Sequence, residues 1–200
     1  LIYNSIIGST LNKIKFGLNY SYDDFDETVD KKDVFYNRID KSIGGFFEYS
    51  YDSMDAVSFV AGIRYDIHNN LGNFFTPRIH MRYQPFEKSV FRFSLGTGRK
   101  SSNIFSENQN IFATGREIKI LNNSGKFYGL DPEKAFNYGL SFRQGFFINN
   151  RVGDITFDYY VTDFDNQVVV DWETQGELSF YNLDGKSYAK SLQVDIEYQL

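Results

Sequence analysis

A regular alternation of apolar and polar residues, sustained over segments of about 9 to 12 residues, is the feature that most constrains this chain. Between Ala56 and Ile67, large apolar side chains occupy every second position, and Ser58, Gly62 and Arg64 lie between them. Successive side chains of a strand point to opposite faces, so this pattern predicts β-strands with one apolar and one polar face. The same pattern recurs in Lys13–Tyr22, Ile43–Tyr51, Thr76–Gln84, Val90–Arg99, Ala135–Phe146, Asp154–Phe164 and Ser187–Leu200, and Leu1–Gly8 fits part of a ninth strand.

The lengths of the strands and of their connections indicate the architecture. Soluble strands are most often about 5 to 6 residues long, whereas about 9 to 11 are needed to cross a bilayer at a tilt. The connections alternate between short (51–55, 84–88, 147–153) and long (23–41, 100–133, 165–186), and only 68–75 is intermediate. Outer-membrane barrels have short turns at one rim and long extracellular loops at the other. We therefore predict an all-β fold, an antiparallel up-and-down meander of about eight transmembrane strands.

Composition narrows the function classes. The 21 Phe and 15 Tyr favour strands, and the absence of Cys excludes disulfides and thiolate chemistry. A net charge of -5 without a basic block makes nucleic acid an unexpected partner. The mean hydropathy of -0.42 and the lack of an apolar run of about 18 residues argue against a membrane helix, but alternating strands escape that test.

Several phrases spread along the chain resemble the barrel of TonB-dependent receptors, particularly those of the Bacteroidota. They are Ala61-Gly-Ile-Arg-Tyr-Asp66, Phe75-Thr-Pro-Arg-Ile-His80, Phe91-Arg-Phe-Ser-Leu-Gly-Thr-Gly-Arg99 with 101–110, Asp131-Pro-Glu-Lys-Ala-Phe-Asn-Tyr-Gly139, 159–170 and Tyr181-Asn-Leu-Asp-Gly185. The resemblance implies a barrel of about 22 strands closed by an N-terminal plug. It also implies import of a scarce nutrient, such as a ferric siderophore, cobalamin or a glycan, with energy from the TonB complex.

The extent of the chain fits only part of such a receptor. The first ten residues contain neither Met nor a basic stretch, so no signal peptide is visible. Eight strands amount to about a third of a barrel of roughly 22. We therefore expect residues 1–200 to be a fragment of the transmembrane barrel domain in the outer membrane, with the plug, the TonB box and the closing strands outside it.

The two faces of the strands provide the candidate site. The polar face carries cations that we expect to line the lumen and to meet the plug or an anionic ligand, namely Arg64, Arg78, His80, Arg82, Arg92 and Arg143. A network with Asp66, Asp158, Asp195 and Glu197 inside the barrel is the alternative role for the arginines. The apolar face should meet lipid through Phe59, Ile63, Met81, Phe93, Leu140, Phe157 and Val194.

Other residues support weaker expectations. Tyrosines predicted near strand ends fit an aromatic girdle at the membrane interfaces: Tyr20, Tyr22, Tyr49, Tyr51, Tyr65 and Tyr83. Gly125, Tyr128 and Gly129 in the longest loop are candidate ligand contacts, although loop tips also vary without function. The acidic residues Asp23, Asp24, Asp26 and Glu27 are suited to a hard cation, but a solvated loop is the simpler interpretation; Asp163 and Asp165 are read in the same way.

The sequence does not predict an enzyme, a cofactor or a metal site. Its two histidines, His68 and His80, lie in or beside strands, and no Ser/His/Asp set stands out. The alternatives to a transporter are a small outer-membrane barrel enzyme or adhesin, and a soluble β-sandwich that binds a ligand.

Overall fold

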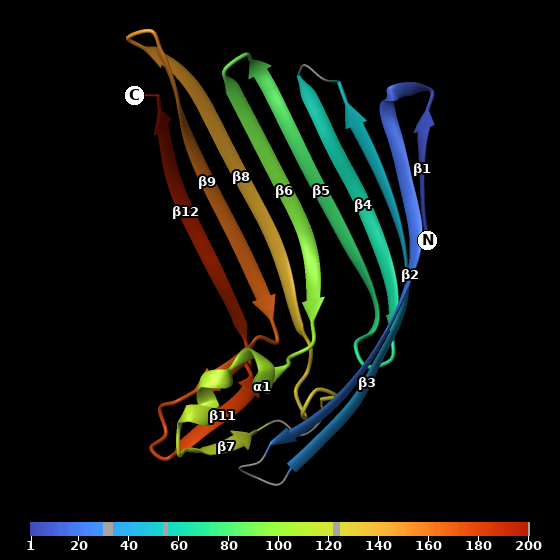
Figure 1. The fold of residues 1–200 in the computed structure, drawn as a ribbon, viewed down its shortest axis with the longest axis vertical. Helices are drawn as coiled ribbons and strands as arrows, with labels where there is room; N and C mark the ends of the chain where they lie inside the picture. Colours follow the sequence, from blue (N-terminus) through green and yellow to red (C-terminus); the bar gives the residue numbers. More distant parts are fainter. Residues whose placement is uncertain (30–33, 54–55, 122–124, 200) are drawn as a thin grey trace.

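A computed structural model describes residues 1–29, 34–53, 56–121 and 125–199 of the chain. Nine strands form one antiparallel sheet in which each strand pairs with its neighbours along the chain, in the order β1-β2-β3-β4-β5-β6-β8-β9-β12 (Figure 1). Their bounds are β1 Ile2–Ile7, β2 Ser9–Val29, β3 Val34–Asp52, β4 Val57–His68, β5 Gly72–Phe86, β6 Ser89–Lys100, β8 Glu133–Ile148, β9 Arg151–Asp165 and β12 Lys186–Tyr198. The predicted all-β meander is confirmed, and the partial ninth strand is β1.

Tight turns connect the strands at one end of the sheet, drawn at the top of Figure 1. Asn149 and Asn150 join β8 to β9 with φ angles of 50° and 62°, the left-handed conformation that a two-residue hairpin turn requires and Asn tolerates. Glu87 and Lys88 join β5 to β6, and Gly8, with φ of 69°, lies between β1 and β2. The predicted gathering of short connections at one rim is confirmed for the residues that the structure covers; residues 54 and 55 lie outside them.

The long connections meet at the opposite end and contain structure of their own. Residues 101–132 include α1 (Ile104–Glu107), η1 (Gln109–Ala113) and β7 (Glu117–Ile120), and residues 166–185 include β10 (Val168–Asp171) and β11 (Glu177–Asn182). β7 pairs in parallel with β11, so the two insertions share a small sheet of order β10-β11-β7. These strands have four to six residues, too few to show a period in the sequence.

The expectation of a loop over 23–41 is wrong, because β2 continues to Val29 and β3 begins at Val34. Acidic residues on the otherwise apolar face, Asp24 and Asp26, hide the alternation there. The ladder nevertheless continues through pairs such as Phe25 with Arg38, and Val29 is buried at its far end. The two strands form a long hairpin that reaches toward the loops.

The buried apolar core lies among the loops rather than on the sheet. It consists of Val29, Ile104, Phe105, Ile111, Ile118, Leu130, Leu178 and Phe180. By contrast, Ile63, Leu140 and Leu192 on the apolar face of the sheet are 48%, 52% and 70% exposed. No described segment covers that face.

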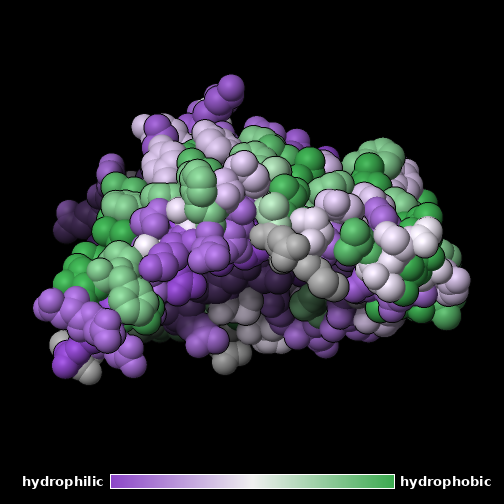
Figure 2. All heavy atoms as spheres, turned by 90° about the horizontal axis from the view of Figure 1, so that it is seen from above, coloured by the Kyte–Doolittle hydropathy of each residue, from purple (hydrophilic) through white to green (hydrophobic). Residues whose placement is uncertain are grey.

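The sheet is an open arc with two free edges, as expected for a barrel fragment. β1 pairs only with β2, and β12 only with β9, over the part of the chain that is placed. Figure 2 shows hydrophilic atoms in the hollowed middle of the arc and hydrophobic atoms mainly around its outer margin. In the described ranges, no helix has the length and apolar character needed to cross a membrane.

Candidate functional site

The pairing register sorts the candidate residues onto two opposite faces. Direct cross-strand partners share a face, so the runs Gly62–Arg78–Gly96, Val60–His80–Ser94 and Ser58–Arg82–Arg92 belong to one polar face. The same register places Arg64 and Arg143 on that face, so all six cationic candidates share it. The seven apolar candidates fall on the other face, through partners such as Phe59–Met81–Phe93–Leu140 and Phe157–Val194.

Three of the arginines are neutralised by carboxylates on the polar face. Arg64 Nε lies 2.6 Å from Asp66 Oδ2, and Arg64 also donates to Asn19 Oδ1 at 2.8 Å. Arg78 pairs with Glu48, and Arg143 Nη2 lies 2.6 Å from Asp154 Oδ2.

The network expected from sequence is thus only partly right. Asp66 is a partner, but Asp158, Asp195 and Glu197 form no ion pair with these arginines in the described structure, whereas Glu48 and Asp154 do. Glycines on the polar face could have indicated the pairing of Arg78 with Glu48. Gly62 lies directly between these two residues, and because it has no side chain it leaves room for the ion pair.

The other three candidate cations, Arg82, Arg92 and His80, have no carboxylate partner among the residues placed by the structure. Arg82 and Arg92 are direct cross-strand partners, an arrangement of like charges that is unfavourable without a counter-charge. Arg82 donates to the Gln84 amide oxygen. Exposed Arg92 and His80 make no hydrogen bond or ion pair with any described residue. A cavity of about 250 Å³ lies beside these cations, bordered also by Tyr160. Its chemistry suits a carboxylate or phosphate group.

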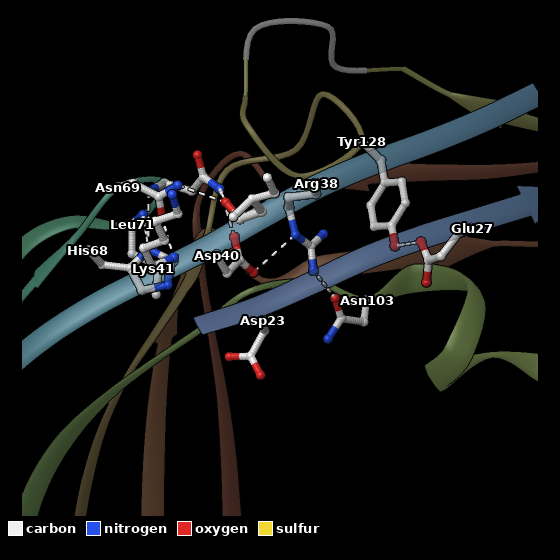
Figure 3. A network of polar contacts seen from close by, with 12 residues as sticks. Asp23, Glu27, Arg38, Asp40, Lys41, His68, Asn69, Leu71, Asn103 and Tyr128 are labelled. Atoms are coloured by element: carbon white, nitrogen blue, oxygen red, sulfur yellow. Dashed lines mark hydrogen bonds and ion pairs between the residues drawn. The ribbon is translucent and has the colours of Figure 1, made fainter. Parts of the chain in front are cut away.

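A partly buried arginine, Arg38, connects the long hairpin to the loop cluster. Arg38 Nε lies 3.0 Å from Asp40 Oδ2, and Arg38 Nη2 donates to Asn103 Oδ1 at 2.6 Å (Figure 3). Its guanidinium lies 4.3 Å from the ring of Phe25 and 5.1 Å from that of Phe127, within cation–π range. Because Arg38 shares the polar face, insertion 101–132 folds over that face of the sheet.

The loop residues predicted as ligand contacts build a turn in this insertion. Tyr128 and Gly129 have φ of 57° and 92°, and the Gly125 N–H donates to Gly129 O at 2.8 Å. The Tyr128 hydroxyl bonds to Glu27 on β2. Burial, together with that hydrogen bond, raises the pKa of Tyr128. Ligand contact by these residues stays a prediction.

The acidic residues at 23–27 do not form one cluster, because strand alternation places Asp23 and Glu27 on the face opposite Asp24 and Asp26. Across the described ranges, no group of three or more His, Cys, Asp or Glu is arranged to hold a metal ion. His68 has a local role: its Nδ1 accepts the N–H groups of Asn70 and Leu71 at 3.0 and 3.1 Å and closes the β4–β5 turn.

Four of the six tyrosines lie toward strand ends as expected. The rings of Tyr65 and Phe75 are tilted against each other with their centres 4.6 Å apart, and the ring centres of Tyr49 and Tyr51 lie 5.6 and 5.9 Å from that of Phe59. Tyr83 faces Phe91 at the short-turn end. Tyr20 and Tyr22 are not near a strand end, because β2 continues to Val29.

Comparison with known proteins agrees with this architecture. The model of the family described as TonB dependent receptor-like, beta-barrel matches residues 3–200. No curated protein sequence matches. The siderophore receptor PirA from Pseudomonas aeruginosa is similar in structure, with a TM-score of 0.66 and 16% identity, over 96% of this chain and 35% of that one.

Two further receptors are similar. The ferric enterobactin receptor PfeA of P. aeruginosa (Q482A mutant) has a TM-score of 0.67 and 13% identity, over 96% of this chain and 32% of PfeA. The FrpB iron transporter from Neisseria meningitidis has a TM-score of 0.60 and 15% identity, over 98% of this chain and 31% of FrpB. The chain therefore spans about a third of the receptors that it resembles. By the family match over almost all of its residues, the chain belongs to the TonB-dependent receptor-like β-barrel family, whose members lie in the Gram-negative outer membrane.

Proposed function

We propose that the full-length protein is a TonB-dependent receptor that imports a scarce nutrient across the outer membrane, with a ferric siderophore as the first ligand class to test. The proposal is carried by one observation: the long loops fold over one end of the polar face, and cations that have no carboxylate partner in the described structure lie further along the same face. A polar face that is partly covered by loops is suited to binding an anionic solute or a chelated metal ion. The similar receptors named above take siderophores or iron, and this supports the choice of ligand class. Cobalamin and glycans are the other classes to compare.

The same proposal assigns the two faces. Arg64, Arg78, His80, Arg82, Arg92 and Arg143 line the lumen, and Phe59, Ile63, Met81, Phe93, Leu140, Phe157 and Val194 face lipid. The free edges of β1 and β12 continue into the remaining strands of a barrel of about 22. A plug domain outside residues 1–200 closes the lumen and couples it to the TonB complex.

The position of the unpaired cations favours the plug as their partner. Arg82 and Arg92 lie within five residues of the β5–β6 turn, at the rim opposite the long loops. A ligand that enters through the loops reaches that level last, so an acidic segment of the plug is the anion that we expect there. The proposed role is transport without catalysis.

The test is uptake by the full-length receptor in a strain that lacks its own siderophore receptors. Cells that carry the receptor should accumulate radioactive iron from a ferric siderophore, and loss of TonB should abolish the uptake. Uptake of cobalamin or growth on a glycan, without iron uptake, would change the ligand class. Accumulation that persists without TonB would contradict the proposed coupling.

A further inference from the structure

β5 and β6 separate at the end of the sheet that carries the long loops. Their ladder runs as far as Arg78 with Gly96 and stops there, although β5 extends back to Gly72 and β6 continues to Lys100. Gln84 donates its backbone N–H to Ala56 at 2.7 Å, on the β4 side of β5. Hydrogen-bonding direction alternates along a strand, so the odd-numbered residues of β5 turn toward β6. Pro77 is such a residue and has no N–H to donate, which accounts for the end of the ladder.

A cavity of about 710 Å³ begins at this separation and runs across β6, β8, β9 and β12; we call it the Pro77 seam. Phe75, Thr97, Arg99, Phe136, Lys186 and Tyr188 are among the residues that line it. The Thr97 hydroxyl oxygen is buried there and makes no hydrogen bond with any residue that the structure places. A buried polar atom without a partner is unfavourable, so the seam offers a hydrogen-bonding group to an occupant.

Three cations and two carboxylates line the seam, a net charge of +1. Arg99, Lys134, Asp165 and Lys186 are successive cross-strand partners on the face opposite the candidate arginines, which gives three cations and one carboxylate in one row. Lys134 Nζ lies 3.2 Å from Asp165 Oδ2. Lys186 forms no ion pair or hydrogen bond within the described part of the chain.

Aromatic side chains occupy the next row toward the middle of the same face. Phe136, Asp163 and Tyr188 are direct partners one step below the row of cations, so Asp163 is the second carboxylate at the seam. Cations at the rim above aromatic rings match an amphiphile with an anionic head and apolar tails.

We propose that the Pro77 seam binds the phosphate-bearing headgroup of an outer-leaflet lipid. Lys134 and Lys186 contact the phosphate, the Thr97 hydroxyl bonds to a headgroup oxygen, and Phe136 and Tyr188 lie along the first part of the acyl chains. The inference rests on the proposed membrane placement of the apolar face. The long loops mark the outer rim, which selects the outer leaflet.

The test uses the full-length receptor in nanodiscs of phosphatidylcholine, with bisphosphorylated lipid A as the probe and native mass spectrometry as the readout of bound lipid. The double variant Lys134→Gln with Lys186→Gln should bind the probe about tenfold more weakly, since each lysine near an anionic lipid surface contributes several-fold in affinity. Pro77→Val restores an N–H, extends the ladder and narrows the seam, so it should also weaken binding without any change in charge. Dephosphorylated lipid A should bind the wild-type receptor no more tightly than bisphosphorylated lipid A binds the double variant.

Lys88 provides the matched control, because it lies 4.7 Å from the ring of Phe147 at the opposite rim and repeats the pairing of a lysine with an aromatic ring. Lys88→Gln should leave probe binding unchanged. Equal binding by wild type and the double variant, an equal loss in Lys88→Gln, or a wild-type receptor that binds no probe or fails to enter the bilayer would each overturn the proposal. Iron uptake is measured on the same proteins. Absence of uptake by the wild-type receptor would refute the proposed transport without affecting the conclusion on lipid binding.

Discussion

Glycines on the polar face determine which side chains can meet there. Gly44 lies between Asn19 and Asp66, and a β-carbon at Gly44 would overlap the Asp66 carboxylate that holds Arg64. Gly139 supports the ring of Tyr160 in the same way, directly across the β8–β9 ladder. These small residues therefore position charged and aromatic groups on neighbouring strands.

We expect Gly139→Ala to destabilise the full-length receptor by about 1 to 3 kcal/mol, because the added carbon forces the Tyr160 ring from its place. The measurement is the midpoint of unfolding in detergent. Gly98→Ala is the matched control on the same face, since a β-carbon there meets nothing within 4 Å, and it should change stability by no more than about 0.5 kcal/mol. An equal cost at both positions would contradict the explanation.

Tyr128 should make the loop cluster sensitive to alkaline pH. Its pKa is raised above the ordinary value of 10.0 by burial and by the hydrogen bond to Glu27. The folded state then holds its proton at a pH where the unfolded loop loses it, so the contribution to stability is full below about pH 10 and falls as the pH rises further. Limited proteolysis of the loops should accelerate above that pH in wild type. Tyr128→Phe should remove this part of the dependence, and an unchanged pH profile in that variant would refute the assignment.

Two elements that the sequence separates, the long β2–β3 hairpin and insertion 101–132, depend on one buried contact. Arg38 and Asp40 have side chains only 10% and 9% exposed, and Asn103 of the insertion completes the site. A charged side chain in such a position is strongly unfavourable when its oppositely charged partner is removed.

Arg38→Met keeps the length of the side chain but leaves the Asp40 carboxylate without a cation, holding only the hydrogen bond from Asn70 Nδ2, with an expected local cost of about 3 to 5 kcal/mol. Hydrogen exchange of the described parts of 101–132 in the full-length receptor should increase. Lys41→Met serves as the control, because exposed Lys41 lies over the ring of Tyr22 on the other face. Unchanged exchange in Arg38→Met would show that the loop core alone holds the insertion.

Strand β6 allows a direct test of which face meets lipid. Phe93 and Ser94 are adjacent and point to opposite faces. Phe93→Arg should impair insertion of the full-length receptor by roughly 2 to 4 kcal/mol if it places charge at the lipid midplane. Ser94→Arg, in the proposed lumen, should insert normally. The amount of folded receptor in the outer membrane measures both, and the reverse order would mean that the aromatic residues fill a core.

The entire described sheet ends in two unpaired strand edges. Exposed edges of this length pair with other chains or aggregate unless further strands cover them. We expect further strands of the full-length receptor to cover these edges.

Residues 1–200 expressed alone should not form a stable barrel in detergent. We expect no heat-modifiable band on electrophoresis, whereas the full-length receptor should show one. A heat-stable band from the fragment, with cross-links between β1 and β12, would indicate a closed small barrel and would favour the enzyme alternative.

The meander could be predicted from sequence because its signal is local. Alternation within each strand, the short turns and the length parity of the connections depend on neighbouring residues, and together they gave the strand order and the sorting of Arg64, Arg92 and Phe93 between two faces. The extension of β2 and β3 was missed because Asp24 and Asp26 interrupt the apolar face there.

The tertiary structure decided the contacts that join distant segments. The pairing of β7 with β11, the place of Asn103 beside Arg38, and the partners Glu48 and Asp154 depend on pairing register and on loops that fold back over the sheet. The pattern of a single segment cannot encode these contacts, because its period fixes the face of a side chain but not the neighbour that it meets across a glycine or a loop.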